Sequence, residues 1–304
     1  MAATPGTATE QPVPPVATRR APMALVTWAF VVLVLVIVAA LLVVKVTRGT
    51  TTAAVIPVTP APAQVVQAAA SVPALVFNTV GTSAPDGPLP VVLTGQPPLI
   101  QNGRAEVVYV GSEFCPYCAA VRWALVVALS RFGSFGHLGQ TRSSPDEVFP
   151  GLQTFSFQGA TFHSRYVSWS AVEEYGPALD TTVPAGFPFL HRPSAEARAL
   201  MARYAGDGRS GSAGGRSGAT LPFIDIGNRV LVEGAGIGFS PGAIQGVSMD
   251  QIAADLSQPT SPVAVAVIGA ANQLTAAICA TTNETPTRVC RSAGVRAGAA
   301  RLGL

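Results

Sequence analysis

Two cysteines three positions apart, Cys115 and Cys118, have the clearest chemical potential in the sequence, within the segment Cys-Pro-Tyr-Cys. A thiol pair at this spacing can exchange disulfides with another protein. One thiolate attacks the partner's disulfide, and the second thiol resolves the mixed disulfide. We expect Cys115 to attack and Cys118 to resolve. Half of a zinc site and an inert structural disulfide are the alternatives.

The residues around this pair predict the elements that position it. The β-branched and aromatic run Val107–Val110 is typical of a buried strand, and the apolar spacing from Ala119 to Arg131 is typical of a helix. The cysteines therefore lie where a strand is followed by a helix. The helix N-terminus carries partial positive charge that would stabilise a thiolate on Cys115, and Pro116 suits the first helical turn because it needs no N–H partner.

A zinc site would need two further ligands. Cys279 and Cys290 are remote in the sequence and do not have the spacing of a second zinc knuckle. The histidines occur singly, at His137, His163 and His191. We therefore expect no metal, and we expect Cys279 and Cys290 to form a structural disulfide, with a second redox pair as the alternative.

Glu113 is the only acid close to the cysteine pair, two positions before Cys115. A carboxylate there could relay a proton or tune the thiols. The alternative is a solvated loop acid.

Two segments carry a resemblance to a known superfamily. Val107–Cys118 followed by a helix resembles the active-site segment of thioredoxin-like proteins, and Cys-Pro-Tyr-Cys is similar to the pairs of glutaredoxins and DsbA-like oxidases. Thr220–Leu231 resembles the cis-proline loop and the following hairpin of that fold, with Gly227-Asn228 as its two-residue turn. The resemblance implies that Pro222 is cis and that Leu221 and Tyr117 contact the client protein, through strand addition at Leu221. An ordinary trans proline at a strand start is the alternative.

The chain is more closely similar to a prokaryotic, membrane-anchored family of thioredoxin-like proteins of unassigned function, domain-of-unknown-function family 929. The segments that carry this resemblance are Glu113–Cys118, Thr154–Phe157 and Asn272–Cys290, and it extends over residues 65–290. It implies an α/β fold with a thioredoxin-like mixed sheet, flanking helices and a helical insertion, preceded by one transmembrane helix. It implies thiol–disulfide chemistry but no particular substrate.

The run from Met23 to Val44 is apolar and uncharged. At 1.5 Å per residue it spans about 33 Å, enough for the bilayer core, so we expect one permanent transmembrane helix rather than a cleaved signal or a twin-arginine signal. Basic residues flank both ends, so charge does not decide the orientation. Four cysteines in two pairs favour an oxidising compartment. We therefore expect a cytoplasmic N-terminus and an extracytoplasmic C-terminal domain in the cell membrane.

Composition restricts the partners. Among 304 residues, 12% are charged and 49% hydrophobic, and the net charge of +3 gives no strong field for nucleic acid. The expected partners are cysteine-containing client proteins, a membrane or extracytoplasmic redox partner, and the bilayer around residues 23–44. No diffusible cofactor is expected. A non-catalytic scaffold module of the same fold is the alternative function.

The predicted organisation follows from these patterns. In chain order it is a disordered cytoplasmic tail (1–22), the transmembrane helix (23–44), a Thr/Pro-rich tether (45–64), the thioredoxin-like domain (65–292) with a flexible insertion around 194–219, and a frayed tail (293–304). Strands are expected at 75–80, 91–93 and 154–157, and helices at 64–70, 195–204, 248–256 and 262–280, the last as a core helix. The aromatic-rich stretch 161–180 is expected to be core rather than a client-binding surface.

Overall fold

The computed structural model describes residues 23–48, 58–82, 87–204 and 220–304. The chain divides into two compact units, residues 1–52 and 53–304. The predicted tail 1–22, part of the tether and most of the predicted insertion lie outside the described residues. The described part of the tether corrects its boundary, because strand β1 (Thr59–Pro60) already pairs with the domain's strand β6 (Gly139–Arg142).

The described part of the first unit is a single helix, α1 (Met23–Arg48). Its large apolar side chains between Trp28 and Val38 are exposed. By length and composition, one helix of the described chain is able to cross a membrane by itself, α7 (Pro262–Thr281). Because 89% of its most apolar stretch is buried, α7 has the surroundings of a core helix, as predicted.

The main sheet of the second unit is mixed. Its strands lie in the order β2-β11-β10-β4-β3, and β9 pairs in parallel with β4. The other pairings are antiparallel. The strands are β2 (Val91–Val92), β3 (Ile100–Gln101), β4 (Arg104–Gly111), β9 (Val167–Glu173), β10 (Phe223–Ile226) and β11 (Val230–Glu233).

Strand β4 has apolar side chains on both faces, as expected for a central strand. Val107 and Tyr109 point to the larger core, whereas Val108 and Val110 belong to a second apolar cluster on the opposite face. The predicted strand Val107–Val110 is therefore confirmed as the centre of β4.

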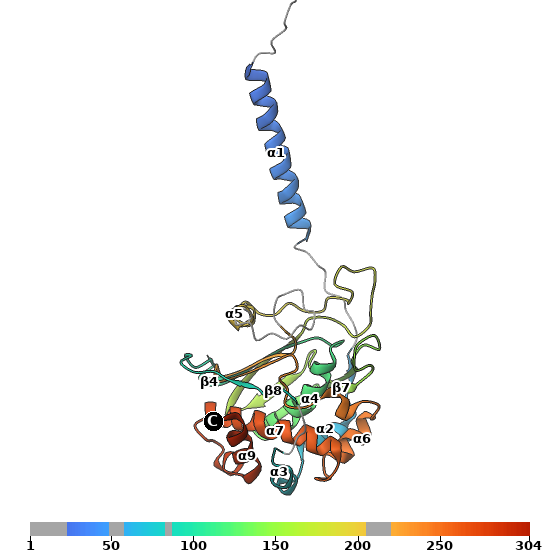
Figure 1. The fold of residues 1–304 in the computed structure, drawn as a ribbon, viewed down its shortest axis with the longest axis vertical. Helices are drawn as coiled ribbons and strands as arrows, with labels where there is room; N and C mark the ends of the chain where they lie inside the picture. The colour runs from blue at the N-terminus through green and yellow to red at the C-terminus, as the bar shows by residue number, and fades with distance from the viewer. Residues whose placement is uncertain (1–22, 49–57, 83–86, 205–219) are drawn as a thin grey trace, which may run out of the picture. The chain divides into compact units, whose positions relative to one another are not determined.

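Helices cover the two faces unequally (Figure 1). α5 (Ala195–Tyr204) lies on one side of the sheet, and the other helices of the domain gather on the other side. Ser194 caps α5 by accepting a hydrogen bond from the Ala197 N–H at 3.0 Å, as predicted. The helices of the larger layer are α2 (Ala63–Ala70), α3 (Ala74–Val80), α4 (Pro116–Leu129), α6 (Met249–Asp255), α7, α8 (Thr287–Cys290) and α9 (Ala293–Leu302), with the 3-10 turn η1 (Pro241–Ile244).

Two small sheets complete the domain. β6 pairs with β1 and with β7 (Gln153–Ser156), and β5 (Gly133–Gly136) pairs with β8 (Thr161–Ser164). The strand predicted at 154–157 thus exists as β7 but lies outside the main sheet. The parallel neighbour of β4 is instead β9, within the aromatic-rich stretch. Trp169 of β9 packs against the core, as predicted for that stretch.

Residues 75–80 were predicted as a strand because of their branched and aromatic composition, and this prediction is wrong. They form α3, whose buried side chains Val76, Phe77 and Val80 lie on one helical face. The Asn272 side chain of α7 donates hydrogen bonds to the carbonyls of Phe77 (2.9 Å) and Gly81 (2.8 Å). The Phe77 carbonyl also accepts the Gly81 N–H, whereas the Gly81 carbonyl is a group that the helix end leaves open, so a distant residue stabilises the end of α3.

The predicted frayed tail is also corrected, because residues 293–302 form α9. Gly294 and Gly298 let this helix approach closely: a Cβ atom on either would clash with the backbone of Phe77 or Asn272. Small residues that look featureless in the sequence thus form a close helix contact.

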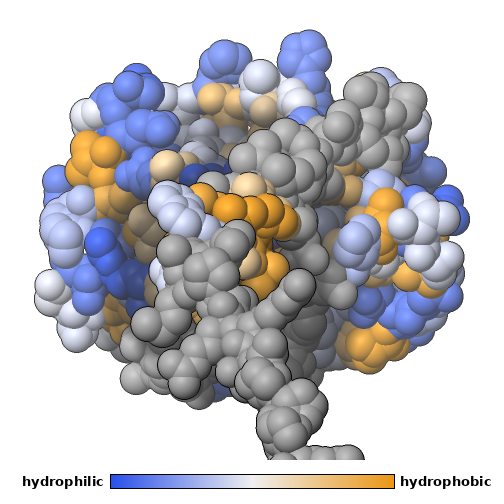
Figure 2. All heavy atoms as spheres, turned by 90° about the horizontal axis from the view of Figure 1, so that it is seen from above, coloured by the Kyte–Doolittle hydropathy of each residue, from blue (hydrophilic) through white to orange (hydrophobic). Residues whose placement is uncertain are grey.

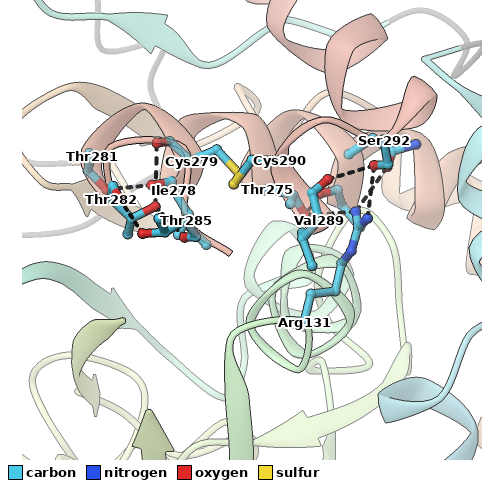
Figure 3. The surroundings of a disulfide bond; sticks show 12 residues. Arg131, Thr275, Ile278, Cys279, Thr281, Thr282, Thr285, Val289, Cys290 and Ser292 are labelled. Atoms are coloured by element: carbon cyan, nitrogen blue, oxygen red, sulfur yellow. Dashed lines mark hydrogen bonds between the residues drawn. A yellow bond between two sulfur atoms is a disulfide. The ribbon is translucent and has the colours of Figure 1, made fainter. Parts of the chain in front are cut away.

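A disulfide joins the end of α7 to α8, between Cys279 and Cys290, as predicted. Figure 3 shows Arg131, which follows α4, reaching the same region. Its guanidinium lies 4.1 Å from the centre of the Phe77 ring and donates a 3.2 Å hydrogen bond to Ser292 Oγ. Burial lowers the pKa of Arg131 to about 10.

The face of the molecule in Figure 2 has hydrophilic residues over most of its outline, with hydrophobic residues in separate patches. Within the described residues of the domain, few large apolar side chains are exposed: Val58, Leu75, Ile100, Val148 and Leu179. The apolar surface of the domain is thus mostly buried in its two clusters.

Candidate active site

Cys115 is the N-cap residue of α4, immediately after the loop that follows β4. Its Sγ accepts a hydrogen bond from the Cys118 N–H at 3.2 Å. Pro116 occupies the first helical turn, as predicted. An N-cap acceptor satisfies a free helix N–H and lies in the positive field of the helix end. The Cys115 sulfur is therefore the hydrogen-bond acceptor at the N-terminus of α4.

Cys118 lies deeper than Cys115. Cys118 is fully buried, and Cys115 keeps 6% of its surface exposed. Both are free thiols. Burial raises the pKa of the Cys118 thiol well above its ordinary value, and Cys115 raises it further, whereas the charge of Arg122 lowers it. The two thiols are thus chemically unequal, with an outer acceptor of hydrogen bonds and an inner protonated thiol.

The Leu221–Pro222 segment lies against the outer cysteine. The peptide bond between these residues is cis, as predicted. The Cys115 Sγ is 3.8 Å from the Leu221 carbonyl oxygen, within hydrogen-bonding range for a thiol donor. The following hairpin turns at Gly227 and Asn228, both with positive φ, and the Arg229 N–H closes it by donating to the Ile226 carbonyl at 2.9 Å.

A buried ion pair that the sequence analysis missed lies behind Cys118. Arg122 of α4 donates to Glu173 of β9 through Nε (2.9 Å) and Nη2 (2.8 Å). Neither side chain is exposed. Arg122 also donates to the Ser112 carbonyl at 2.8 Å and to the Tyr109 hydroxyl at 3.0 Å. Because the guanidinium and the carboxylate form two hydrogen bonds and neither is accessible to water, the pair fixes the position of α4 relative to β9.

The charges of this ion pair affect the inner thiol. Burial raises the pKa of Glu173 to about 7, although Arg122 acts to lower it. Glu173 raises the pKa of Cys118, opposite in effect to Arg122. A carboxyl group with a pKa near neutrality can take up and release a proton under physiological conditions. Glu173 is therefore suited to exchange a proton in the neighbourhood of Cys118.

Glu113 is not a solvated loop acid, because it is 3% exposed. Its Oε1 accepts a 2.5 Å hydrogen bond from Ser156 Oγ, and its Oε2 has no hydrogen-bond partner among the described residues. Glu113 also lines a cavity of about 560 Å³. Its charge raises the pKa of both Arg122 and Glu173. It thus lies between a cavity and the buried ion pair.

Tyr117, expected to contact a client, is half-buried. Its ring meets Phe149 edge-on, with centroids 6.0 Å apart. It is therefore positioned by the core, with part of its surface left exposed next to the cysteines.

The structure brings Cys115, Cys118, Leu221 and Glu113 to one end of the sheet and leaves Cys279 and Cys290 in their own disulfide at α7 and α8. Within the described ranges, no group of three or more His, Cys, Asp or Glu side chains is placed to hold a metal ion. The sequence did contain a signal for the missed ion pair. Arg122 is the only charge in the apolar helix α4, and a lone charge in such a helix needs a buried partner.

The fold and site define a mixed α/β domain with a free dithiol at the N-terminus of a buried helix. A family model, Domain of unknown function (DUF929), matches residues 91–280. This is more than half of the chain, and the chain therefore belongs to that family. No curated protein and no solved structure matches the chain.

Proposed function

We propose that the chain is a membrane-anchored, extracytoplasmic thiol–disulfide oxidoreductase with a thioredoxin-like domain that acts on protein cysteines. The observation that carries the proposal is the position of Cys115. It caps α4, accepts the Cys118 N–H, and lies beside the Leu221 carbonyl before a cis proline.

The strand order supports the thioredoxin-like assignment. Four strands lie in the order β9-β4-β10-β11, with β9 parallel to β4 and the other neighbours antiparallel. The dithiol helix follows the central strand β4, and the cis proline directly precedes β10. These are the two segments on which the resemblance to the superfamily rests.

The proposed reaction has two steps. The Cys115 thiolate attacks one sulfur of a client disulfide; a mixed disulfide forms, the client bond breaks, and the first client sulfur leaves as a thiolate that takes a proton from water. Cys118 then loses its proton and attacks the Cys115 sulfur. The mixed disulfide breaks, and the second client thiolate leaves. The client gains two electrons and the pair becomes a disulfide, which a membrane or extracytoplasmic dithiol partner reduces.

The second step needs a proton acceptor because burial keeps Cys118 protonated. Glu173, with a pKa raised to about 7, is the acceptor that we assign. Arg122 stabilises the negative charge that develops on the Cys118 sulfur, since its charge lowers the pKa of that thiol. Glu113 connects this interior to the cavity that it lines, which gives the proton an exit.

The location rests on two features. The apolar run 23–44 lies within α1, which we assign as the single membrane anchor. The Cys279–Cys290 disulfide supports an oxidising, extracytoplasmic environment for the domain.

One observation favours a second candidate, a binding or scaffold module without turnover. Both thiols of the proposed pair are buried in the structure, and a buried thiol does not reach a protein disulfide.

Two serine variants distinguish these functions. Full-length protein in detergent is mixed with a synthetic peptide closed by one disulfide. With Cys118→Ser we expect a stable mixed disulfide through Cys115. With Cys115→Ser we expect none, together with loss of peptide reduction. A scaffold module would form no mixed disulfide in either variant, and that result would contradict the proposed function.

A further inference from the structure

Helix α5 covers the sheet face that is continuous with the proposed exchange site. Its inward residues, Ala197, Leu200, Met201 and Tyr204, are buried and follow the spacing of one helical face. They share one apolar cluster with Cys115, Cys118 and Leu221. The outward residues between them, such as Ala199 and Ala202, are exposed. One apolar face of α5 therefore covers the sheet face on its side of the domain (Figure 1), from the cluster that includes Cys115 to the β10–β11 turn, where the Tyr204 hydroxyl donates to Asn228 Oδ1 at 2.9 Å.

The surface beneath α5 is an apolar sheet face with an acidic end. Val108, Val110 and Phe223 form its apolar part. On the same face, because side chains alternate along each strand, lie Glu106 of β4 and Asp225 of β10, which pairs with Val108. This face is thus apolar near the cysteines and carries carboxylates further along the strands.

Both carboxylates are buried, and each has one oxygen that accepts a hydrogen bond and one for which the described residues provide no donor. Glu106 Oε1 accepts a 2.7 Å hydrogen bond from Ser170, and Asp225 Oδ1 accepts a 2.6 Å bond from the Asn228 N–H. Their second oxygens, Oε2 and Oδ2, are buried without a hydrogen-bond partner in the described part of the chain. Buried carboxylate oxygens are stabilised by cations. α5 supplies a positive charge at Asp225, on which Arg203 acts electrostatically, and a negative one near Glu106, on which Glu196 acts.

We propose that this sheet face is the client-docking surface, that α5 occupies it in the resting protein, and that it selects client segments with apolar residues at the cysteine and a basic residue about four positions away. The spacing follows from the strand: Leu221 lies at Cys115, and Asp225 is four residues further along an extended chain. The selection follows the end of α5 at Asp225, where an apolar face is combined with Arg203. The proposal rests on the proposed function, since it specifies the client of that site.

The first test measures access to Cys115 in full-length protein with Cys118→Ser, where Cys115 is the remaining free thiol. Leu200→Asp with Met201→Asp places two charges in the apolar face of α5. We expect alkylation of Cys115 by a polymer-linked maleimide to accelerate at least tenfold. Ala199→Asp with Ala202→Asp places the same charges on the exposed face and should leave the rate unchanged. Equal rates in both double variants would overturn the proposal.

A second measurement needs no change in α5. Hydrogen exchange of residues 195–204 is compared in the Cys118→Ser protein before and after it forms a mixed disulfide with a cysteine peptide. Displacement of α5 predicts at least tenfold faster exchange of these amides in the mixed disulfide. Unchanged protection would overturn the proposal even if the double variant fails to fold.

The third test addresses selection. Two activated disulfide peptides differ only in Arg or Glu four residues from the cysteine. We expect the unmodified protein to react at least fivefold faster with the Arg peptide. The preference should fall below twofold in Glu106→Gln with Asp225→Asn, and persist in Asp250→Asn, a control at an exposed acid of α6. Equal rates with both peptides in the unmodified protein would overturn the selection.

The outcomes separate this inference from the proposed function. If the peptides react without charge preference and α5 stays protected, the docking surface is wrong and thiol–disulfide exchange stands. If alkylation accelerates when α5 is disrupted but no peptide forms a mixed disulfide, α5 is a cover and the proposed exchange function is wrong.

Discussion

The two cysteine pairs of the domain lie in opposite kinds of surroundings. Cys279 and Cys290 are bonded to each other at the end of α7, where their role is to hold α8 in place. Cys115 and Cys118 are free thiols, Cys115 caps α4, and an ion pair lies behind Cys118. A structural disulfide requires only that the two sulfur atoms are correctly placed. A pair that is oxidised and reduced also requires groups that stabilise a thiolate and accept its proton.

Two arginines that lie near the two cysteine pairs, one within α4 and one just after it, also differ in their partners. Arg122, near Cys118, is paired with the carboxylate of Glu173. Arg131, near the disulfide, meets the Phe77 ring and the hydroxyl and amide groups of Thr275, Ser292 and Asn272. In the described part of the chain, Arg122 thus hydrogen-bonds a carboxylate, whereas the hydrogen bonds of Arg131 go to neutral groups. This difference is the one on which the proposed role of Glu173 as proton acceptor for Cys118 rests.

The largest expected effect on stability comes from removing one partner of the Arg122–Glu173 ion pair. Glu173→Gln leaves the Arg122 guanidinium buried without its charge partner, which costs about 3–5 kcal/mol of unfolding free energy. Denaturant unfolding of the full-length chain measures this loss. Replacing both residues, Arg122→Met with Glu173→Leu, should restore more than half of the lost stability because no uncompensated charge remains.

The same variants test whether the ion pair contributes to disulfide exchange as well as to stability. The stable double variant should resolve mixed disulfides at least tenfold more slowly than the unmodified protein, since it lacks the proton acceptor for Cys118. Full resolution rates in the double variant would show that the ion pair is only structural.

The local parts of the site could be predicted from sequence, and the long-range parts could not. The strand before Cys115 and Pro116 in the first turn of α4 follow from neighbouring residues, and the cis bond at Pro222 was implied by the superfamily resemblance. The ion pair joins residues 51 positions apart, and nothing in either segment identifies the other.

The errors in secondary structure have the same origin. Residues 75–80 have strand-like composition but form a helix whose end is capped by Asn272. Gly294 and Gly298 lie in the segment that was expected to be a frayed tail, and they instead form a close contact between helices. In each case the decisive contact is with an element distant in sequence.

A smaller effect is expected from opening the structural disulfide. Cys279→Ser with Cys290→Ser should lower the unfolding free energy by about 2–3 kcal/mol, the value for releasing a short closed loop in the chain-entropy model. The exchange rate of Cys115 should stay within twofold of the unmodified protein. Unfolding and peptide reduction measured on the same preparation test both statements. Loss of exchange in a folded variant would mean that the two pairs act together.

The smallest expected effect is a pH dependence of stability at Asp225. Burial raises the pKa of this carboxyl from 3.8 to about 6. Because the folded pKa is the higher one, the protonated form favours folding, and this contribution is fully present below pH 3.8 and lost as the pH rises to about 6. Asp225→Asn should therefore gain stability relative to the unmodified protein across this interval, by less than about 3 kcal/mol.

A difference between Asp225→Asn and the unmodified protein that stays flat over this pH interval would contradict the burial of that carboxyl under α5.

The most direct test of the contrast between the two pairs is acid-quenched thiol trapping of the full-length protein in its own cells, with a mass tag for each free thiol. Short oxidising and reducing pulses precede the quench. We predict that Cys115 and Cys118 pass reversibly between dithiol and disulfide while Cys279–Cys290 stays oxidised throughout. A Cys115–Cys118 pair that remains a dithiol through the oxidising pulse, or four free thiols in untreated cells, would contradict a redox-active pair in an extracytoplasmic domain.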